Sequence, residues 1–264
     1  GMVTVKGGEI GQGDIERVLD SAKTMSIPAD REVIHIIPQE YIVDNQRGIA
    51  NPIGMAGIRL QVNVHIVTGA VTSVQNIMRS CHHSQIEVAD IALESLASAK
   101  AVLTPEEREI GVALVDIGGG TTDIAIFANN SIKYTEVLAL GGQNLSNDIA
   151  FGLRTPIASA EKIKIKYSCA MMDLVHNDEV ILVPSVGGRQ PRKISRMALA
   201  QICEPRMDEI LCLVDQSLER SGIKHMLGAG VVLTGGTSLI EGCQELGEQI
   251  FKTSTRIGAP RNVE

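Results

Sequence analysis

Apolar residues along this chain form two kinds of pattern, continuous runs and regular alternation. Residues 112–115 and 124–127 are uninterrupted apolar runs, as in strands that are buried on both faces. Residues 58–68 alternate apolar and polar positions, as in a strand with one exposed face. The pattern predicts an α/β protein with further strands near 32–43, 132–140, 180–183 and 230–234, helices near 14–23, 144–153, 156–170, 195–221 (interrupted at Pro205) and 238–251, two helical segments around a short strand near 85–88, and loops at 45–57 and 184–193.

A glycine-rich turn joins the two continuous apolar runs and carries an aspartate on each side. Gly118, Gly119 and Gly120 have no Cβ atom, so the backbone can adopt positive φ there and bring its N–H groups close to an anion. Asp116 and Asp123 lie at strand ends within apolar sequence, where an ionised carboxylate needs a compensating partner. A Mg²⁺–phosphate complex would supply one. The alternative is an ordinary β-hairpin with two solvated aspartates.

Two further glycine turns each lie between a strand and a helix. The turns are Gly141-Gly142 and Gly235-Gly236. Turns of this kind direct helix N-termini and backbone N–H groups toward anions. Three such corners within about 120 residues favour a single ligand that is held from several sides.

Composition and missing motifs exclude several classes of function. A net charge of -7 and an aromatic content of 2% without Trp count against nucleic-acid binding. Five scattered cysteines without a C-x-x-C motif indicate reduced thiols in a cytosolic protein, and Cys81-His82-His83 has no second cluster at metal-ligand spacing. The P-loop, G-x-S-x-G and H-E-x-x-H motifs are all absent, and no apolar run approaches the roughly 18 residues of a membrane span.

The motif order along the chain carries a resemblance to a known superfamily. Asp-x-Gly-Gly-Gly-Thr-x-Asp at 116–123, followed by Gly-Gly at 141 and Thr-Gly-Gly-Thr at 234, resembles the second half of actin-like ATP-binding proteins, which include sugar kinases and chaperone ATPases. Further segments are similar to the FtsA family of bacterial cell-division proteins, namely Ile37-Pro-Gln-Glu-Tyr41, Pro184-Ser-Val-Gly-Gly-Arg189, Glu204-Pro-Arg206, Val232-Leu-Thr-Gly-Gly236 and Arg256-Ile-Gly-Ala-Pro260. The resemblance covers essentially the whole chain and implies an actin-like (ribonuclease H-like) α/β fold with an inserted small α+β subdomain.

The resemblance also implies a division of the chain into four parts. Residues 1–66 would be the inserted subdomain, and residues 67–110 would be part of the first actin-like lobe. Residues 111–155 and 225–264 would form the core of the second lobe. Residues 156–224 would be the peripheral subdomain of that lobe and would carry the surface for a partner protein.

An ATP site with Mg²⁺ is implied by the same resemblance. Asp116 would bind Mg²⁺ through water, and Asp116 and Asp123 would be the catalytic candidates. Glu161 and Lys164 match a Glu-x-x-Lys helix that lines the adenosine, and three residues apart they share a helix face. Their alternative is a solvated ion pair on a surface helix. The residues implied to contact the nucleotide are Gly118, Gly119, Gly120, Thr121, Thr122, Gly141, Gly142, Glu161, Lys164, Gly235, Gly236 and Thr237.

The function implied by the resemblance is that of an ATP-binding adaptor in bacterial cell division. Such a protein tethers the C-terminal tail of the tubulin-like FtsZ to the cytoplasmic membrane, helps to assemble the divisome, and self-associates into actin-like filaments. The parent protein would be peripheral on the cytoplasmic face of the inner membrane at the division site, with at most slow ATP hydrolysis. We expect Arg206, in the segment 204–209, to contact FtsZ, and we expect no nucleic-acid partner.

Two features of the family have no counterpart in these residues, namely the first phosphate loop and the amphipathic C-terminal helix that reaches the membrane. We therefore expect a fragment that binds ATP feebly and does not bind lipid by itself. Two alternatives stay open beside the cell-division hypothesis. One is an actin-like kinase, a phosphotransferase, and the other is an actin-like pilus-assembly adaptor.

Overall fold

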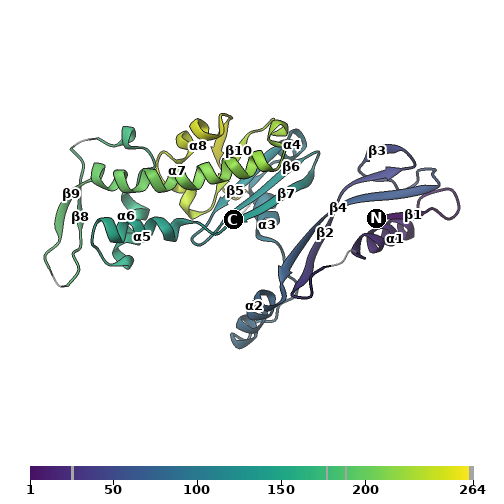
Figure 1. The fold of residues 1–264 in the computed structure, drawn as a ribbon, viewed down its shortest axis with the longest axis horizontal. Helices are drawn as coiled ribbons and strands as arrows, with labels where there is room; N and C mark the ends of the chain where they lie inside the picture. Colours follow the sequence, from purple (N-terminus) through teal and green to yellow (C-terminus); the bar gives the residue numbers. More distant parts are fainter. Residues whose placement is uncertain (25–26, 177, 188, 262–264) are drawn as a thin grey trace. The chain divides into compact units, whose positions relative to one another are not determined.

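The computed structural model describes residues 1–24, 27–176, 178–187 and 189–261, which cluster into two compact units (Figure 1). The first unit comprises residues 1–97 and 131–133, and the second comprises residues 98–130 and 134–264. Each unit has its own sheet and its own hydrophobic core.

The first unit is an antiparallel sheet with a helix packed on it. Within the described residues its strands lie in the order β1-β4-β2-β3. Strands β2 and β4 are the long pair, and their register shifts just after Pro38, which has no N–H to give to the ladder. Val18 of α1 packs with Tyr41, Leu60 and Val62 to form the core. The elements are β1 (Met2–Thr4), α1 (Gln12–Lys23), β2 (Arg31–Val43), β3 (Gln46–Ile49), β4 (Arg59–Ala70) and α2 (Val71–His83).

The second unit contains a mixed sheet that is covered on both faces. Its described strands lie in the order β11-β10-β5-β6-β7, with β5 parallel to β10 and antiparallel to β6. Every residue of β5 and β6 is buried, as their continuous apolar runs predicted. These strands are β5 (Val112–Ile117), β6 (Thr122–Ala128), β7 (Ser131–Leu138), β10 (Val231–Thr234) and β11 (Thr255–Ile257).

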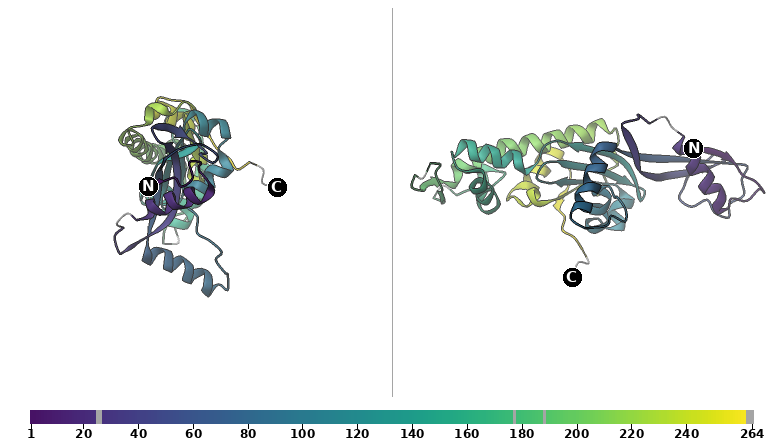
Figure 2. Two further views of the ribbon diagram at one scale, coloured as in Figure 1. Left: turned by 90° about the vertical axis from the view of Figure 1, so that its right-hand side faces the viewer. Right: turned by 90° about the horizontal axis from the view of Figure 1, so that it is seen from below.

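A long helix runs along the second unit from a small hairpin to the sheet. Figures 1 and 2 show α7 (Arg196–Arg220) extending from the β8–β9 hairpin past the five-stranded sheet. Its buried side includes Leu199, Met207 and Leu218. The remaining elements are α3 (Glu94–Val102), α4 (Pro105–Ile110), α5 (Gly142–Gly152), α6 (Ile157–Tyr167), η1 (Met172–Leu174), β8 (Val180–Val183), β9 (Arg192–Ser195), η2 (Lys224–Met226), η3 (Gly236–Leu239) and α8 (Cys243–Phe251).

Two predicted features of the secondary structure are wrong. No strand forms near 85–88, where the backbone turns at Gln85 with a φ of 58°. Helix α7 continues through Pro205, because it buries Cys203 before the proline and Met207 after it, and this packing outweighs one missing hydrogen bond. The short strands β3 and β9 lie in or next to segments that were expected to be loops, and the helix expected at 156–170 ends at Tyr167.

Candidate functional site

Two aspartates face each other at the end of the hairpin formed by β5 and β6. Asp116 and Asp123 are direct cross-strand partners, with 9% and 8% of their surface exposed. Neither forms an ion pair with any residue that the structure describes. Burial raises the pKa of Asp123, the charge of Asp116 raises it further, and a hydrogen bond from Thr121 opposes both. Like charges placed opposite each other are destabilising, so this pair favours a bound cation.

Both oxygens of Asp116 lie close to other parts of the protein. Ser98 of α3 donates a hydrogen bond from Oγ to Asp116 Oδ2, at 2.7 Å. A Cβ atom at Gly235 would lie 2.5 Å from Asp116 Oδ1, and the φ of Gly235 is +85°. Only glycine fits that position without strain. No sequence pattern points to Ser98, because a single serine on a helix belongs to no motif.

The first glycine turn is open on its outer side. Gly118 N donates to Thr121 O at 2.9 Å and closes the turn. Gly119 and Gly120 are exposed, and a Cβ atom at either would meet nothing within 4 Å. Within the described chain their two amides donate no hydrogen bond. Two adjacent free N–H groups beside a carboxylate pair can bind an anion that carries a divalent cation.

None of residues 118–120 has a positive φ. Glycine is needed instead at the second turn, which approaches the first turn closely. A Cβ atom at Gly141 would lie 2.7 Å from Gly119 O and 2.8 Å from Gly118 O. Gly142 N donates to Gly118 O at 2.9 Å, so the two turns are joined by direct hydrogen bonds.

The third turn meets the first two at the same place. Thr237 donates from Oγ1 to Gly118 O at 3.0 Å, and a Cβ atom at Gly142 would lie 2.3 Å from Thr237 Oγ1. Gly236 has open space on its Cβ side. We refer to residues 116–123, 141–142 and 235–237 together as the glycine site. Thr122 lies within this range, but its side chain is buried and its hydroxyl donates to Leu140 O at 2.8 Å, so it is not available to a ligand.

Glu161 and Lys164 of α6 pack against the second turn. Lys164 is 8% exposed, and its Nζ lies 3.0 Å from Gly142 O and 2.8 Å from Glu161 Oε2. Ser146 of α5 donates to the same Glu161 oxygen and to Gly142 O. Burial raises the pKa of Glu161, but the bonds from Lys164 and Ser146 outweigh it and hold the pKa below its usual value. The pair is therefore partly internal, because Lys164 is buried although 41% of the Glu161 side chain is exposed, and it is not a fully solvated surface pair.

A cavity of about 280 Å³ opens beside the glycine site. It lies between the end of α6 and η3. Its walls include Lys164 of the Glu161–Lys164 pair and Gly236 of the third glycine turn. Its polar and apolar walls are Lys164, Ile165, Lys166, Ser168, Arg196, Gly236, Leu239, Ile240 and Glu241. Mixed polar and apolar walls of this kind are typical of small-molecule sites.

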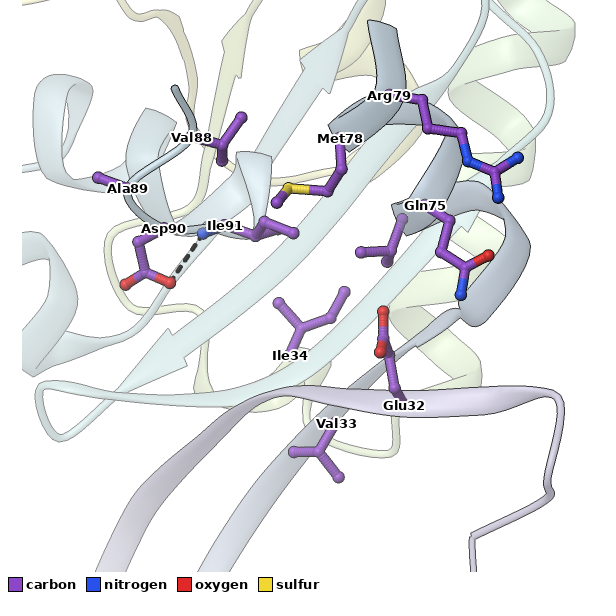
Figure 3. A pocket seen from close by; sticks show the side chains of 11 residues that line it. Glu32, Val33, Ile34, Gln75, Met78, Arg79, Val88, Ala89, Asp90 and Ile91 are labelled. Carbon is purple, nitrogen blue, oxygen red and sulfur yellow. Dashed lines mark hydrogen bonds between the residues drawn. The ribbon is translucent and has the colours of Figure 1, made fainter. Parts of the chain in front are cut away.

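A second cavity, of about 620 Å³, belongs to the first unit and lies between β2, α2 and residues 88–91 (Figure 3). Its walls include Ile34, Met78 and Ile91, and Asp90 accepts a hydrogen bond from the amide of Ile91 at 2.8 Å. None of the residues of the glycine site lines it.

The structure places Arg206 away from the glycine site, in contact with α5. Its Nε lies 2.6 Å from Asp148 Oδ2, its second nitrogen lies 3.2 Å from Asp148 Oδ1, and it also pairs with Glu209. The side chain is 24% exposed. Arg206 therefore joins α5 to α7 by a forked ion pair and still reaches the surface.

The donor set at the glycine site is compatible with Mg²⁺ that is bound together with a phosphate. In the parts of the chain that the structure describes, no cluster of three or more His, Cys, Asp or Glu side chains could hold a metal alone. Mg²⁺ is usually held by one or two carboxylates, with phosphate oxygens and water completing the shell. The Asp116–Asp123 pair beside two free amides offers such a set. Separately, none of the described helices is both long and apolar enough to cross a membrane.

Two family models match this chain. The model described as Cell division protein FtsA matches residues 113–264, and the model described as SHS2 domain inserted in FTSA matches residues 1–68. The Cell division protein FtsA of Pseudomonas aeruginosa is 52% identical over 264 residues, which is 100% of this chain. That of Escherichia coli K12 is 42% identical over 270 residues. The chain spans 63% and 64% of the length of these two relatives.

Solved structures share the fold at low sequence identity. MreB5 of Spiroplasma citri bound to ADP has a TM-score of 0.59 at 22% identity, over 72% of this chain and 61% of that one. The PilM–PilN type IV pilus biogenesis complex has a TM-score of 0.61 at 14% identity, over 97% of this chain and 65% of that one. These likenesses show the fold alone, and they confirm the predicted actin-like fold with its inserted α+β part.

Proposed function

Because the chain belongs to the family of Cell division protein FtsA, we propose that it is the ATP-binding, actin-like core of a cell-division adaptor. The adaptor tethers FtsZ to the cytoplasmic membrane at the division site and helps to assemble the divisome. It self-associates into actin-like filaments, and it is peripheral on the cytoplasmic face, attached through a C-terminal helix. Family membership favours this role over the kinase and pilus-assembly alternatives.

The observation that carries the nucleotide part of this proposal is the meeting of three glycine turns beside two carboxylates, Asp116 and Asp123, that form no ion pair with the described residues. Gly118 O accepts hydrogen bonds from both other turns, while the amides of Gly119 and Gly120 stay free for an anion. The fold neighbour MreB5 of Spiroplasma citri is bound to ADP in one structure and to AMPPNP in another. A nucleotide is the ligand that combines an anionic chain, a divalent cation and a flat base.

Each part of the nucleotide has residues that would hold it. Asp116 and Asp123 would carry the hydrated Mg²⁺, and the amides of Gly119 and Gly120 would face the phosphates. The cavity beside Lys164 would take the base and ribose. Bound ATP would supply binding energy that shifts the populations of conformations, so slow turnover is sufficient for the role.

A titration with a fluorescent ATP analogue tests the site. In the presence of Mg²⁺, Asp116→Asn should weaken binding by about tenfold or more, because a carboxylate that holds the cation is lost. Asp30→Asn, at an exposed aspartate of the first unit, is the matched control and should bind as the parent does. Binding that is unchanged by Asp116→Asn, or that does not depend on Mg²⁺, would contradict the proposal.

The α5–α7 face, which we define as Asp148, Phe151, Arg206 and Glu209, is the surface that we propose for the FtsZ tail. Phe151 is 89% exposed and lies three residues after Asp148, so the two share one side of α5. An exposed aromatic side chain beside an arginine is typical of the central residues of protein interfaces.

Titration with a synthetic FtsZ C-terminal tail peptide tests this face. Phe151→Ala removes a side chain that is almost free of packing, and we expect about tenfold weaker binding. Arg206→Glu should weaken binding too, but it also places three carboxylates together, so its folding must be checked by circular dichroism. Ile58→Ala, at a side chain that is 74% exposed in the first unit, is the control. If Phe151→Ala and a correctly folded Arg206→Glu variant both bind the peptide as the parent does, the α5–α7 face is not the binding surface.

A further inference from the structure

Arg196 joins three segments of the second unit through one guanidinium group. Its Nε donates to Tyr167 O at the end of α6, at 2.8 Å. A second nitrogen lies 2.8 Å from Glu179 Oε2, just before β8, and a third forms an ion pair with Glu241. Its backbone N–H also donates to Glu179 O at 2.8 Å. Only 14% of the side chain is exposed.

The position of Arg196 is unfavourable for a cation unless its carboxylate partners stabilise it. Arg196 is the first residue of α7, where the positive end of the helix dipole disfavours a cation. Its partial burial adds a desolvation cost. Two carboxylates from distant segments, Glu179 and Glu241, offset both costs. The arrangement is that of a bridge between the two segments that carry these acids.

One end of the bridge is a wall of the small cavity. Glu241 follows η3 and lines the cavity together with Arg196 and Gly236. The backbone of Glu241 is fixed as well, because Ala170 N donates to Glu241 O at 2.8 Å and Cys169 pairs with Glu241 as an isolated bridge. A displacement of this wall would therefore reach the guanidinium directly.

The other end of the bridge is the β8–β9 hairpin. Glu179 immediately precedes β8, and β9 runs straight into Arg196. The two-stranded hairpin exposes Val180 and Leu182, at 59% and 60%, on one face. A two-stranded sheet is marginally stable without tertiary support, so its order depends on contacts such as the one with Arg196.

We propose that Arg196 is a positioning residue that couples the cavity wall to the β8–β9 hairpin, so that a nucleotide in the cavity alters the order of the hairpin. The ligand half of this statement rests on the proposed nucleotide binding. The mechanical half, a coupling between Glu241 and the hairpin through Arg196, does not. If Arg196 had only a structural role, substitutions of Glu179 and of Glu241 would affect the protein independently of each other.

Amide hydrogen exchange measured by mass spectrometry tests the mechanical half without any ligand. Glu241→Gln alters a side chain of the cavity wall and weakens its ion pair with Arg196, without touching the hairpin. We expect exchange in residues 180–183 and 192–195 to rise about tenfold, as when one charged hydrogen bond is weakened. In an Arg196→Gln background the same change should have no further effect. Arg220→Gln breaks an ion pair with Glu136 elsewhere on α7 and is the control that should leave the hairpin unchanged.

Two results would overturn the coupling. One is hairpin exchange that Glu241→Gln leaves unchanged, and the other is an effect of Glu241→Gln that is equal in the parent and in the Arg196→Gln background. Should Arg196→Gln not fold, Arg196→Lys takes its place, because an ammonium group retains the charge but cannot fork to both carboxylates.

A second arm adds ADP with Mg²⁺ and separates the two proposals. In the parent, ADP should slow exchange both in residues 117–123 and in the hairpin. In Arg196→Gln it should slow exchange in residues 117–123 only. Equal protection of the hairpin in both proteins would sink the coupling. Absence of protection at residues 117–123 in the parent would instead count against the proposed nucleotide site, while the ligand-free arm still decides the coupling.

Discussion

Charged side chains are arranged in opposite ways at the glycine site and at the α5–α7 face. At the glycine site, Asp116 and Asp123 face each other at 9% and 8% exposure without a cation from the described chain. At the α5–α7 face, Arg206 forms ion pairs with Asp148 and Glu209, and 24% of its side chain is exposed. The first region holds charge that the protein leaves uncompensated, and the second holds charge that the protein compensates itself.

This difference separates a site that needs a charged ligand from a face whose arginine is already paired within the protein. A buried carboxylate without a partner costs stability, and such a cost is retained where a ligand removes it. A forked arginine–carboxylate pair gives stability and orientation at once. Substitutions at the two regions should therefore differ in size, in sign and in their response to pH.

The largest effect is expected from crowding at the glycine site. Gly235→Ala would place a methyl group 2.5 Å from Asp116 Oδ1 and 2.6 Å from Ile117 O, at a φ of +85°. Backbone cannot move aside as a flexible side chain can, so we expect a loss of about 3 kcal/mol or more in the free energy of unfolding. Urea denaturation followed by circular dichroism measures it.

The neighbouring glycine provides the control for this prediction. Gly236→Ala meets nothing within 4 Å, so its effect should stay within about 1 kcal/mol. Equal stabilities of the two variants would show that the inner side of the site is not as tightly packed as the structure shows it.

An intermediate effect is expected at the α5–α7 face. Asp148→Asn leaves Arg206 with Glu209 as its remaining carboxylate partner among the described residues. The pair is partly exposed, so we expect a loss of about 1–2 kcal/mol in the same urea experiment. Asp20→Asn breaks an exposed ion pair with Lys23 and should cost less than about 0.5 kcal/mol. A loss at Asp148 no greater than that at Asp20 would argue that Arg206 is not a structural link.

Sequence patterns predicted the parts of the fold with a strong local signal. The fully buried β5 and β6 follow directly from their continuous apolar runs. The short β3, with the sequence Gln46-Arg-Gly-Ile49, has no such run, and it forms because it pairs with the end of β2. Pro205 shows the converse, since tertiary packing of α7 overrides a local helix breaker.

At the candidate site, the sequence predicted the glycine turns but not the side chains that support them. The turns are visible because glycine pairs between a strand and a helix form a pattern. Ser98 and Ser146 leave no pattern, although they bond to Asp116 and Glu161. The partner of Arg206 lies 58 residues away in the chain, and no spacing rule connects the two positions.

The smallest expected effect is a change in stability with pH, and its sign tells whether the carboxylates of the glycine site are uncompensated. Burial, together with the charge of Asp116, holds the pKa of Asp123 above its ordinary value of 3.8 in the folded protein. The folded state therefore binds more protons than the unfolded state between these two pKa values, so stability falls as pH rises through that window. Asp123→Asn removes this penalty and, without ligand, should raise stability at pH 7 by about 0.2–1 kcal/mol.

The gain should vanish as the pH is lowered toward the ordinary aspartate pKa, because both proteins are then uncharged at this position. Glu107 is the control of opposite sign. Despite the opposing effect of burial, its hydrogen bonds with Arg256 hold its pKa below the usual value, so its contribution is present at neutral pH and is lost as pH falls. Urea denaturation of Asp123→Asn and Glu107→Gln at pH 7 and near pH 4 measures both slopes. Slopes of the same sign would mean that the carboxylates of the glycine site are compensated within the protein and need no cation.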